Sequence, residues 1–187
     1  MQKDLTLLIL HGIGGKAGEH WEQYLHDASQ KLGLQVLMPQ LPGGDRPDRK
    51  IWNSLITKML LNIDPGKLII VGHSLAVPTV LDWLETIDKP LKCLISVSGF
   101  AYDYGFELNS YYLKEKEINF TKVKRNLRKA YVLYGDDDPY VTQKALADLA
   151  LSLQVTPKIY PKGGHLSTRA GFTTFPDLVE IIKNEIN

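Results

Sequence analysis

A serine between small residues is the part of the sequence best suited to covalent chemistry. Residues 72–76 read Gly-His-Ser-Leu-Ala, directly after the apolar run 68–71 and directly before a segment of helical pattern. A sharp turn from strand to helix would expose the Ser74 hydroxyl, and small residues two positions either side would let neighbouring backbone pass close. Such patterns also arise by chance, so a nucleophilic serine is indicated only if a base and an acid accompany it.

An acid and a histidine follow in a suitable order. Asp136, Asp137 and Asp138 come after the apolar segment 130–134, and His165 follows two glycines after the short segment 158–160. The histidine would take the proton of Ser74 and an aspartate would orient the histidine, and Ser, Asp, His is the chain order of α/β-hydrolases. The aspartates could instead form only a solvated turn. They are a poor cation site, because three adjacent acids cannot all face one ion.

The joint order of these motifs resembles a known family over nearly the whole chain. The chain is similar to the small serine hydrolases of the YdeN and retinoblastoma-binding-protein-9-like group. In such hydrolases the acid usually falls three residues after the glycine that ends its strand, which implies Asp138 and leaves Asp137 as the alternative. The matching features are the His-Gly turn 11–12, Gly-Glu-His-Trp at 18–21, Met-Pro-Gln-Leu-Pro at 38–42, Gly-His-Ser-Leu at 72–75, Asp-Asp-Pro at 137–139 and Gly-His at 164–165.

Acyl transfer also needs hydrogen-bond donors for the oxyanion. The usual donors are the amide after the nucleophile and an amide from the loop after an early strand, which here are the backbone N–H groups of Leu75 and Ile13. The glycine-rich loop 11–18 also loosely resembles a dinucleotide-binding turn. Its glycine spacing is irregular, and the next strand-like segment, 35–38, is followed by no acid placed to hold a ribose, so this alternative is disfavoured.

Apolar segments alternate with segments of helical period along the chain. The strand-like segments lie near 5–10, 35–38, 67–71, 92–98, 130–134 and 156–160. This alternation predicts an α/β fold in three layers, with a parallel sheet between two layers of helices. The resemblance implies the α/β-hydrolase version of it, with a trimmed sheet of about six strands in the order 2-1-3-4-5-6 and no large lid.

One substantial insertion, residues 99–129, separates the fourth and fifth strands of a predicted single domain spanning 1–187. It is rich in aromatic residues, and packing against the sheet is their more common role. Some of them could line a substrate pocket, for which we consider His11, Phe100, Tyr102, Tyr104 and Phe106. The insertion ends in a basic run, 122–129, but the net charge of +1 favours an ordinary basic helix face over a nucleic-acid site.

Composition fits one compact domain, and acyl transfer by a serine needs no cofactor. The 187 residues are 44% hydrophobic, and no apolar stretch of about 18 residues or signal sequence is present, so we expect a cytoplasmic protein with no membrane partner. Cys93 is the only cysteine and should lie buried in a strand, which excludes an intrachain disulfide. His11, His20, His26 and His73 lack partners at metal-ligand spacing, so no metal is expected.

These observations predict a serine hydrolase that cleaves a small ester or amide through an acyl-enzyme. Ser74, His165 and Asp138 would form the triad, and the amides of Ile13 and Leu75 would hold the oxyanion. The alternative is a protein-binding module on a hydrolase scaffold, with little or no activity. The retinoblastoma-binding signature Leu-x-Cys-x-Glu is not matched, because residues 91–95 read Leu-Lys-Cys-Leu-Ile. The sequence therefore does not support the expectation of a protein partner.

Overall fold

A single parallel sheet forms the centre of the molecule. The computed structural model describes residues 5–186, and residues 1–4 and 187 of the predicted domain lie outside the described residues. The strand order is β2-β1-β3-β4-β5-β6 and every neighbouring pair is parallel, so the predicted order is confirmed. In chain order the strands are β1 (Thr6–Leu10), β2 (Gln35–Leu37), β3 (Leu68–His73), β4 (Cys93–Val97), β5 (Ala130–Gly135) and β6 (Lys158–Tyr160).

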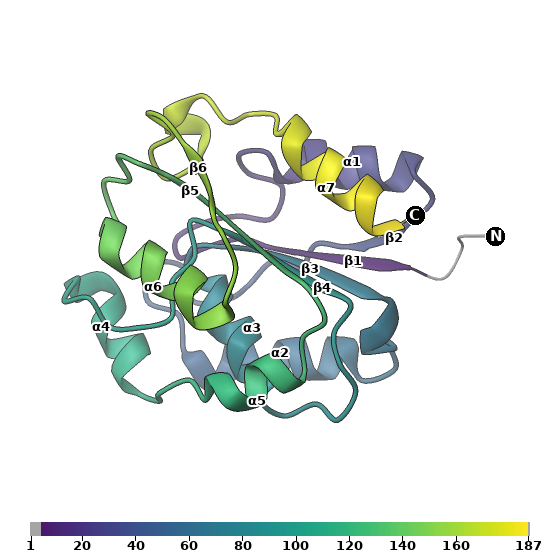
Figure 1. Cartoon of the computed structure of the whole chain (residues 1–187), viewed down its shortest axis with the longest axis horizontal. Coiled ribbons are helices and arrows are strands. Elements are labelled where there is room, and N and C mark those ends of the chain that lie inside the picture. Colours follow the sequence, from purple (N-terminus) through teal and green to yellow (C-terminus); the bar gives the residue numbers. More distant parts are fainter. Residues whose placement is uncertain (1–4, 187) are drawn as a thin grey trace.

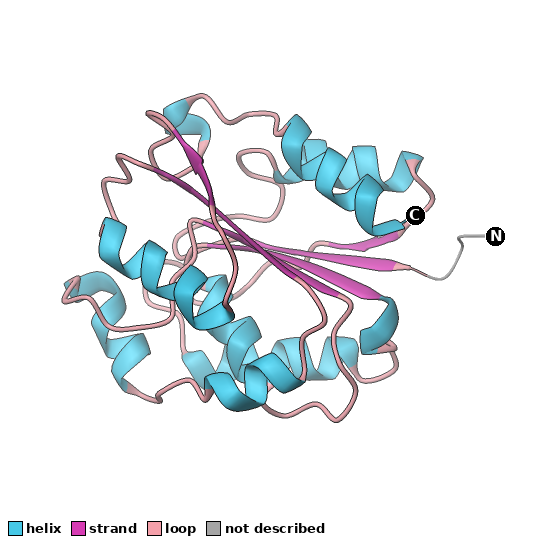
Figure 2. Cartoon of the chain, viewed as in Figure 1, coloured by secondary structure: helices cyan, strands magenta, loops and turns pink. Residues whose placement is uncertain are grey.

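Helices cover both faces of this sheet (Figures 1 and 2). Helices α1 (Glu22–Lys31) and α7 (Pro176–Ile186) lie side by side on one face. The other face carries α2 (Arg49–Leu60), α3 (Ala76–Leu84), α5 (Phe120–Arg125) and α6 (Gln143–Leu153). The remaining elements are α4 (Glu107–Lys114) and the short 3₁₀ turns η1 (Pro65–Lys67) and η2 (Thr168–Ala170). The predicted three-layer arrangement is therefore confirmed.

Two apolar clusters hold the layers together, one on each face of the sheet. Alternate side chains of a strand point to opposite faces, so Leu8 of β1 packs with α2 and α3 while Ile9 packs with α1 and α7. Both faces are buried, which explains why β1, β3 and β4 are mostly apolar runs in the sequence. Cys93 is buried in β4, as predicted.

Insertion 99–129, which contains α4 and α5, is attached to helices α2 and α3 by a buried arginine. Arg49 of α2 donates from Nε and Nη2 to the two carboxylate oxygens of Asp82 of α3, at 2.7 and 2.9 Å. Its Nη1 donates to the carbonyls of Tyr112 and Lys116, at 2.8 and 2.9 Å, where α4 ends. The guanidinium thus satisfies carbonyls that a helix end leaves without intrahelical partners, and it positions the insertion.

Loss of this arginine is expected to destabilise the fold strongly. Arg49→Met should lower the free energy of unfolding by about 3–5 kcal/mol, because it leaves the buried Asp82 carboxylate without its main partner. Lys50→Met is the matched control, since the neighbouring Lys50 side chain is 84% exposed and, among the described residues, its one ion pair is with Glu115 at the surface. That change should cost less than about 1 kcal/mol. Urea unfolding of both variants checks this, and equal losses would contradict the proposed role of Arg49.

Candidate active site

Ser74 occupies the tight turn between β3 and α3. Its φ of +54° lies in the left-handed region, which a residue other than glycine adopts only under constraint. The turn is fixed on both sides, because the Ser74 N–H donates to the Val97 carbonyl at 2.9 Å and the Ser74 carbonyl accepts from the Val77 N–H at 3.1 Å. The serine therefore lies at the carboxyl end of the sheet, where it lines a pocket.

Tight packing around Ser74 explains why two nearby positions are glycine. A Cβ atom on Gly12 would lie 2.9 Å from the Cβ of Ser74, closer than side chains tolerate. A Cβ on Gly72 would lie 3.2 Å from the Val77 side chain. The loop after β1 thus passes directly against the serine, and glycine is what permits this.

His165 receives its orientation from Asp138. The Asp138 Oδ2 atom lies 2.7 Å from His165 Nδ1, and the Asp138 side chain is fully buried. The other carboxylate oxygen of Asp138 accepts from the backbone N–H groups of Tyr140 and Val141, at 2.9 and 3.0 Å. Because the carboxylate can only accept, Nδ1 carries the proton, and Nε2 is the ring nitrogen that keeps a lone pair.

The other two aspartates bind the backbone of the histidine loop. Asp136 Oδ1 accepts from the Lys162 N–H at 2.8 Å, and Asp137 Oδ1 accepts from the Gly164 N–H at 2.7 Å. Neither makes a hydrogen bond to the His165 ring among the described residues, whereas Asp138 does. The three acids therefore have separate partners, and this geometry favours Asp138 over Asp137 as the acid that orients His165.

Two buried aromatic residues anchor the same loop from the opposite side. His73 Nε2 donates to the His165 carbonyl at 3.0 Å, and Trp21 Nε1 donates to the Leu166 carbonyl at 2.9 Å. Burial, with a smaller effect of the nearby His165, holds the pKa of His73 well below its usual range. His73 thus stays a neutral donor. This role of His73 was not predicted, and the one signal for it in the sequence is its place directly before Ser74.

The predicted oxyanion donors lie on two segments that meet at Ser74. Ile13 follows β1 and lines the pocket, and Leu75 immediately precedes α3, where the helix dipole favours negative charge. In the described part of the chain, neither backbone N–H donates a hydrogen bond to another group. The loop of Ile13 is held by His11, whose Nδ1 donates to the Gly12 carbonyl at 2.7 Å and whose Nε2 accepts from the Leu41 N–H at 2.9 Å.

The family follows from comparison of this chain with known proteins. A model of the family described as serine hydrolase matches residues 7–184. The chain belongs to the serine hydrolase family. A search of curated proteins found no match to its sequence.

Solved structures show the same fold for this serine hydrolase. The YdeN gene product from B. subtilis superposes with a TM-score of 0.89 at 22% identity, over 97% of this chain and 98% of that one. Est1E from Butyrivibrio proteoclasticus superposes with a TM-score of 0.76 at 16% identity, over 100% of this chain and 90% of that one. A YdeN-like hydrolase from Pectobacterium atrosepticum superposes with a TM-score of 0.70 at 14% identity, over 98% of this chain and 91% of that one. The resemblance to YdeN-type small serine hydrolases is confirmed.

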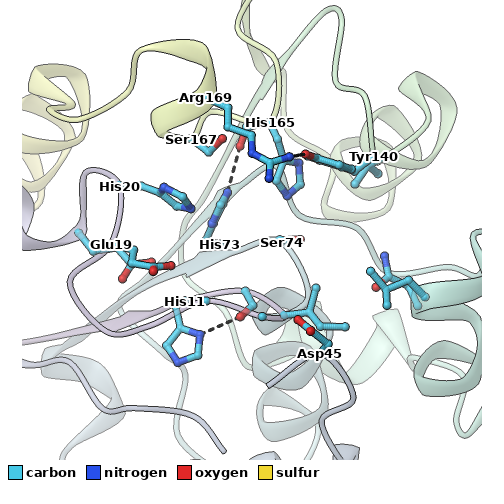
Figure 3. A pocket seen from close by; sticks show the side chains of 18 of the residues that line it. His11, Glu19, His20, Asp45, His73, Ser74, Tyr140, His165, Ser167 and Arg169 are labelled. Carbon is cyan, nitrogen blue, oxygen red and sulfur yellow. Dashed lines mark hydrogen bonds between the residues drawn. The ribbon is translucent and has the colours of Figure 1, made fainter. Parts of the chain in front are cut away.

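A cavity of about 400 Å³ opens beside Ser74 and His165 of the serine hydrolase (Figure 3). Its walls come from the loop after β1, the start of α1, the start of α4 and the segment 165–169. Tyr140 packs edge-on against the His165 ring, with centroids 5.2 Å apart, and its hydroxyl accepts a hydrogen bond from Arg169. His20, Tyr140 and Arg169 were not predicted, because only the fold brings their segments together.

The structure corrects part of the predicted pocket lining. His11 and Phe106 line the cavity, but Phe100, Tyr102 and Tyr104 do not. Phe100 is fully buried in the core, and Tyr104 packs between it and Phe106. The Tyr102 hydroxyl instead shares a 2.7 Å hydrogen bond with Ser152 of α6. Phe100 and Tyr104 therefore pack in or against the core, whereas Tyr102 lies at the surface beside α6.

Two further features concern membranes and metals. Within residues 5–186, no helix combines the length and apolar character that crossing a bilayer requires. In the same part of the chain, no three His, Cys, Asp or Glu side chains form a group that could hold a metal ion.

Proposed function

We propose that this serine hydrolase cleaves a small ester or amide through an acyl-enzyme formed on Ser74. One observation carries the proposal: the buried Asp138 carboxylate binds Nδ1 of His165 at 2.7 Å, and His165 lines the same pocket as the constrained Ser74. A histidine oriented by a carboxylate is the base that a nucleophilic serine requires.

The reaction proceeds in two halves. Ser74 Oγ attacks the carbonyl carbon while His165 Nε2 takes the hydroxyl proton, and the amides of Ile13 and Leu75 bind the resulting oxyanion. Collapse of the tetrahedral intermediate breaks the ester or amide bond, and His165 gives its proton to the leaving alcohol or amine. Water then attacks the acyl-enzyme, with His165 again as base, which releases the carboxylic acid and restores Ser74.

The pocket supports a small substrate. A volume of about 400 Å³ lies at the lower end of the range for small-molecule sites, and the exposed side chains of Phe106 and Leu108 give its rim an apolar part. This size suits a short or medium acyl or leaving group rather than a long lipid chain.

Covalent labelling tests the proposal. A fluorophosphonate is attacked at phosphorus by an activated serine and loses fluoride, so the purified protein should gain one adduct, seen by intact mass and located on Ser74 by peptide mapping. Parallel assays with matched nitrophenyl esters and nitroanilides then separate esterase from amidase activity. A folded protein without any adduct, or with an adduct elsewhere, would overturn the proposal and favour a non-catalytic binding protein.

A further inference from the structure

The pocket contains a buried carboxyl group that the proposed reaction does not use. Glu22 in the first turn of α1 is fully buried and lines the cavity. Its Oε2 accepts from the Gly18 N–H at 3.0 Å, but its Oε1 has no hydrogen-bond partner among the described residues. Buried polar atoms without partners are costly and rare in native folds. An unpaired carboxyl oxygen on a residue that lines the active-site cavity therefore points to a ligand that completes it.

The surroundings of Glu22 lack a positive charge. Burial, with a smaller contribution from the neighbouring Glu19, raises the pKa of Glu22 to about 8. No lysine or arginine forms an ion pair with Glu22 in the described residues. A cation brought beside this carboxyl would favour its ionised form and would gain a partner protected from water.

Two other carboxylates also favour a cation in this pocket. Glu19 and Asp45 both line the cavity, and neither forms an ion pair within residues 5–186. Arg169 is the one lysine or arginine among the described lining residues. Figure 3 shows Glu19 between His20 and His11, whereas Arg169 lies by His165 and Tyr140. The wall built by α1 and the loop before it is therefore acidic.

We propose that this pocket selects substrates carrying a protonated amine, which binds the free oxygen of Glu22. Glu19 and Asp45 add longer-range attraction for the same cation. The proposal rests on the proposed hydrolase function, because it concerns the acyl or leaving group held in the same cavity. An ammonium group has three donors and no acceptor, so it suits an acceptor that no protein donor occupies.

Matched substrates test the proposal. The methyl esters of phenylalanine and of hydrocinnamic acid differ only in the amino group. We expect kcat/KM to be at least about tenfold higher for the amino ester, because a charge-assisted hydrogen bond of this kind contributes that much or more. Glu22→Gln should remove most of this preference. Glu180→Gln is the matched control, because Glu180 is an exposed residue of α7 outside the pocket, and it should retain the full ratio.

A second readout does not depend on turnover. In isothermal titration, phenethylamine should bind the wild-type protein at least about tenfold more tightly than phenethyl alcohol, and Glu22→Gln should bring the two affinities together. Equal kcat/KM for both esters together with equal affinity for amine and alcohol would overturn the amine preference. A preference for the methyl monoester of a dicarboxylic acid would overturn it too, in favour of recognition by Arg169. Absence of fluorophosphonate labelling would contradict the hydrolase function alone, and titration would still decide the amine question.

Discussion

Ser74→Ala is expected to abolish fluorophosphonate labelling and to lower kcat by a factor on the order of 10⁶. Alanine removes the only atom that can form the acyl-enzyme, so what remains is reaction by bound water assisted by the oxyanion donors. The fold should persist, because the change removes one oxygen and keeps a Cβ at a φ that serine already adopts. Intact mass after labelling and steady-state ester hydrolysis measure the effect.

Two comparisons make this test specific. Ser167 also lines the pocket, so Ser167→Ala should retain the adduct, which separates an activated serine from one that is merely accessible. His165→Ala should lower kcat nearly as much as Ser74→Ala, and the double variant should be no worse than either, because serine and histidine act as one unit. An adduct that survives Ser74→Ala, or losses that add in the double variant, would contradict the assignment.

The second large effect is expected from the acid. Asp138→Asn should lower kcat by about 10⁴, because the asparagine amide can donate to Nδ1 and so force the His165 proton onto Nε2, the atom that must accept the serine proton. The contact at stake is the 2.7 Å hydrogen bond between Asp138 and the ring. Single-turnover labelling and ester hydrolysis should slow together.

Neighbouring aspartates supply matched controls for this prediction. Asp137→Asn and Asp136→Asn change the same functional group one and two residues away, but their carboxylates bind the backbone N–H groups of Gly164 and Lys162. An asparagine carbonyl can still accept those hydrogen bonds, so we expect losses of less than about tenfold. A larger loss from Asp137→Asn than from Asp138→Asn would move the role of the acid to Asp137.

The arrangement of the sheet shows why much of the fold was predictable. Strands buried on both faces are mostly apolar runs, and β1, β3 and β4 stand out in the sequence for that reason. Parallel strands end at the same edge of a sheet, so polar residues directly after β3, β5 and β6 were expected to meet there. The hydrogen bond between Asp138 and His165 shows that the last two do meet.

In the insertion, the sequence does not show which side chains are buried. An aromatic residue in an irregular segment gives no periodic signal of the direction in which its side chain points. Phe100 and Phe106 are equally aromatic, yet the first is buried in the core and the second lines the pocket. The Arg49–Asp82 pair joins two helices from distant parts of the sequence, and local pattern carries no information about such partners.

The sequence by itself determined the strands, the serine turn and the order of serine, acid and histidine, because these depend on local apolar pattern, glycine placement and chain direction. Only the tertiary structure decided which aspartate contacts His165, which residues anchor its loop, and that Glu22 is buried in the pocket. An acidic residue in the first turn of a helix is usually a solvated partner of the helix dipole. Glu22 is buried instead. Local sequence pattern does not predict this, because burial depends on how the segments of the chain pack together.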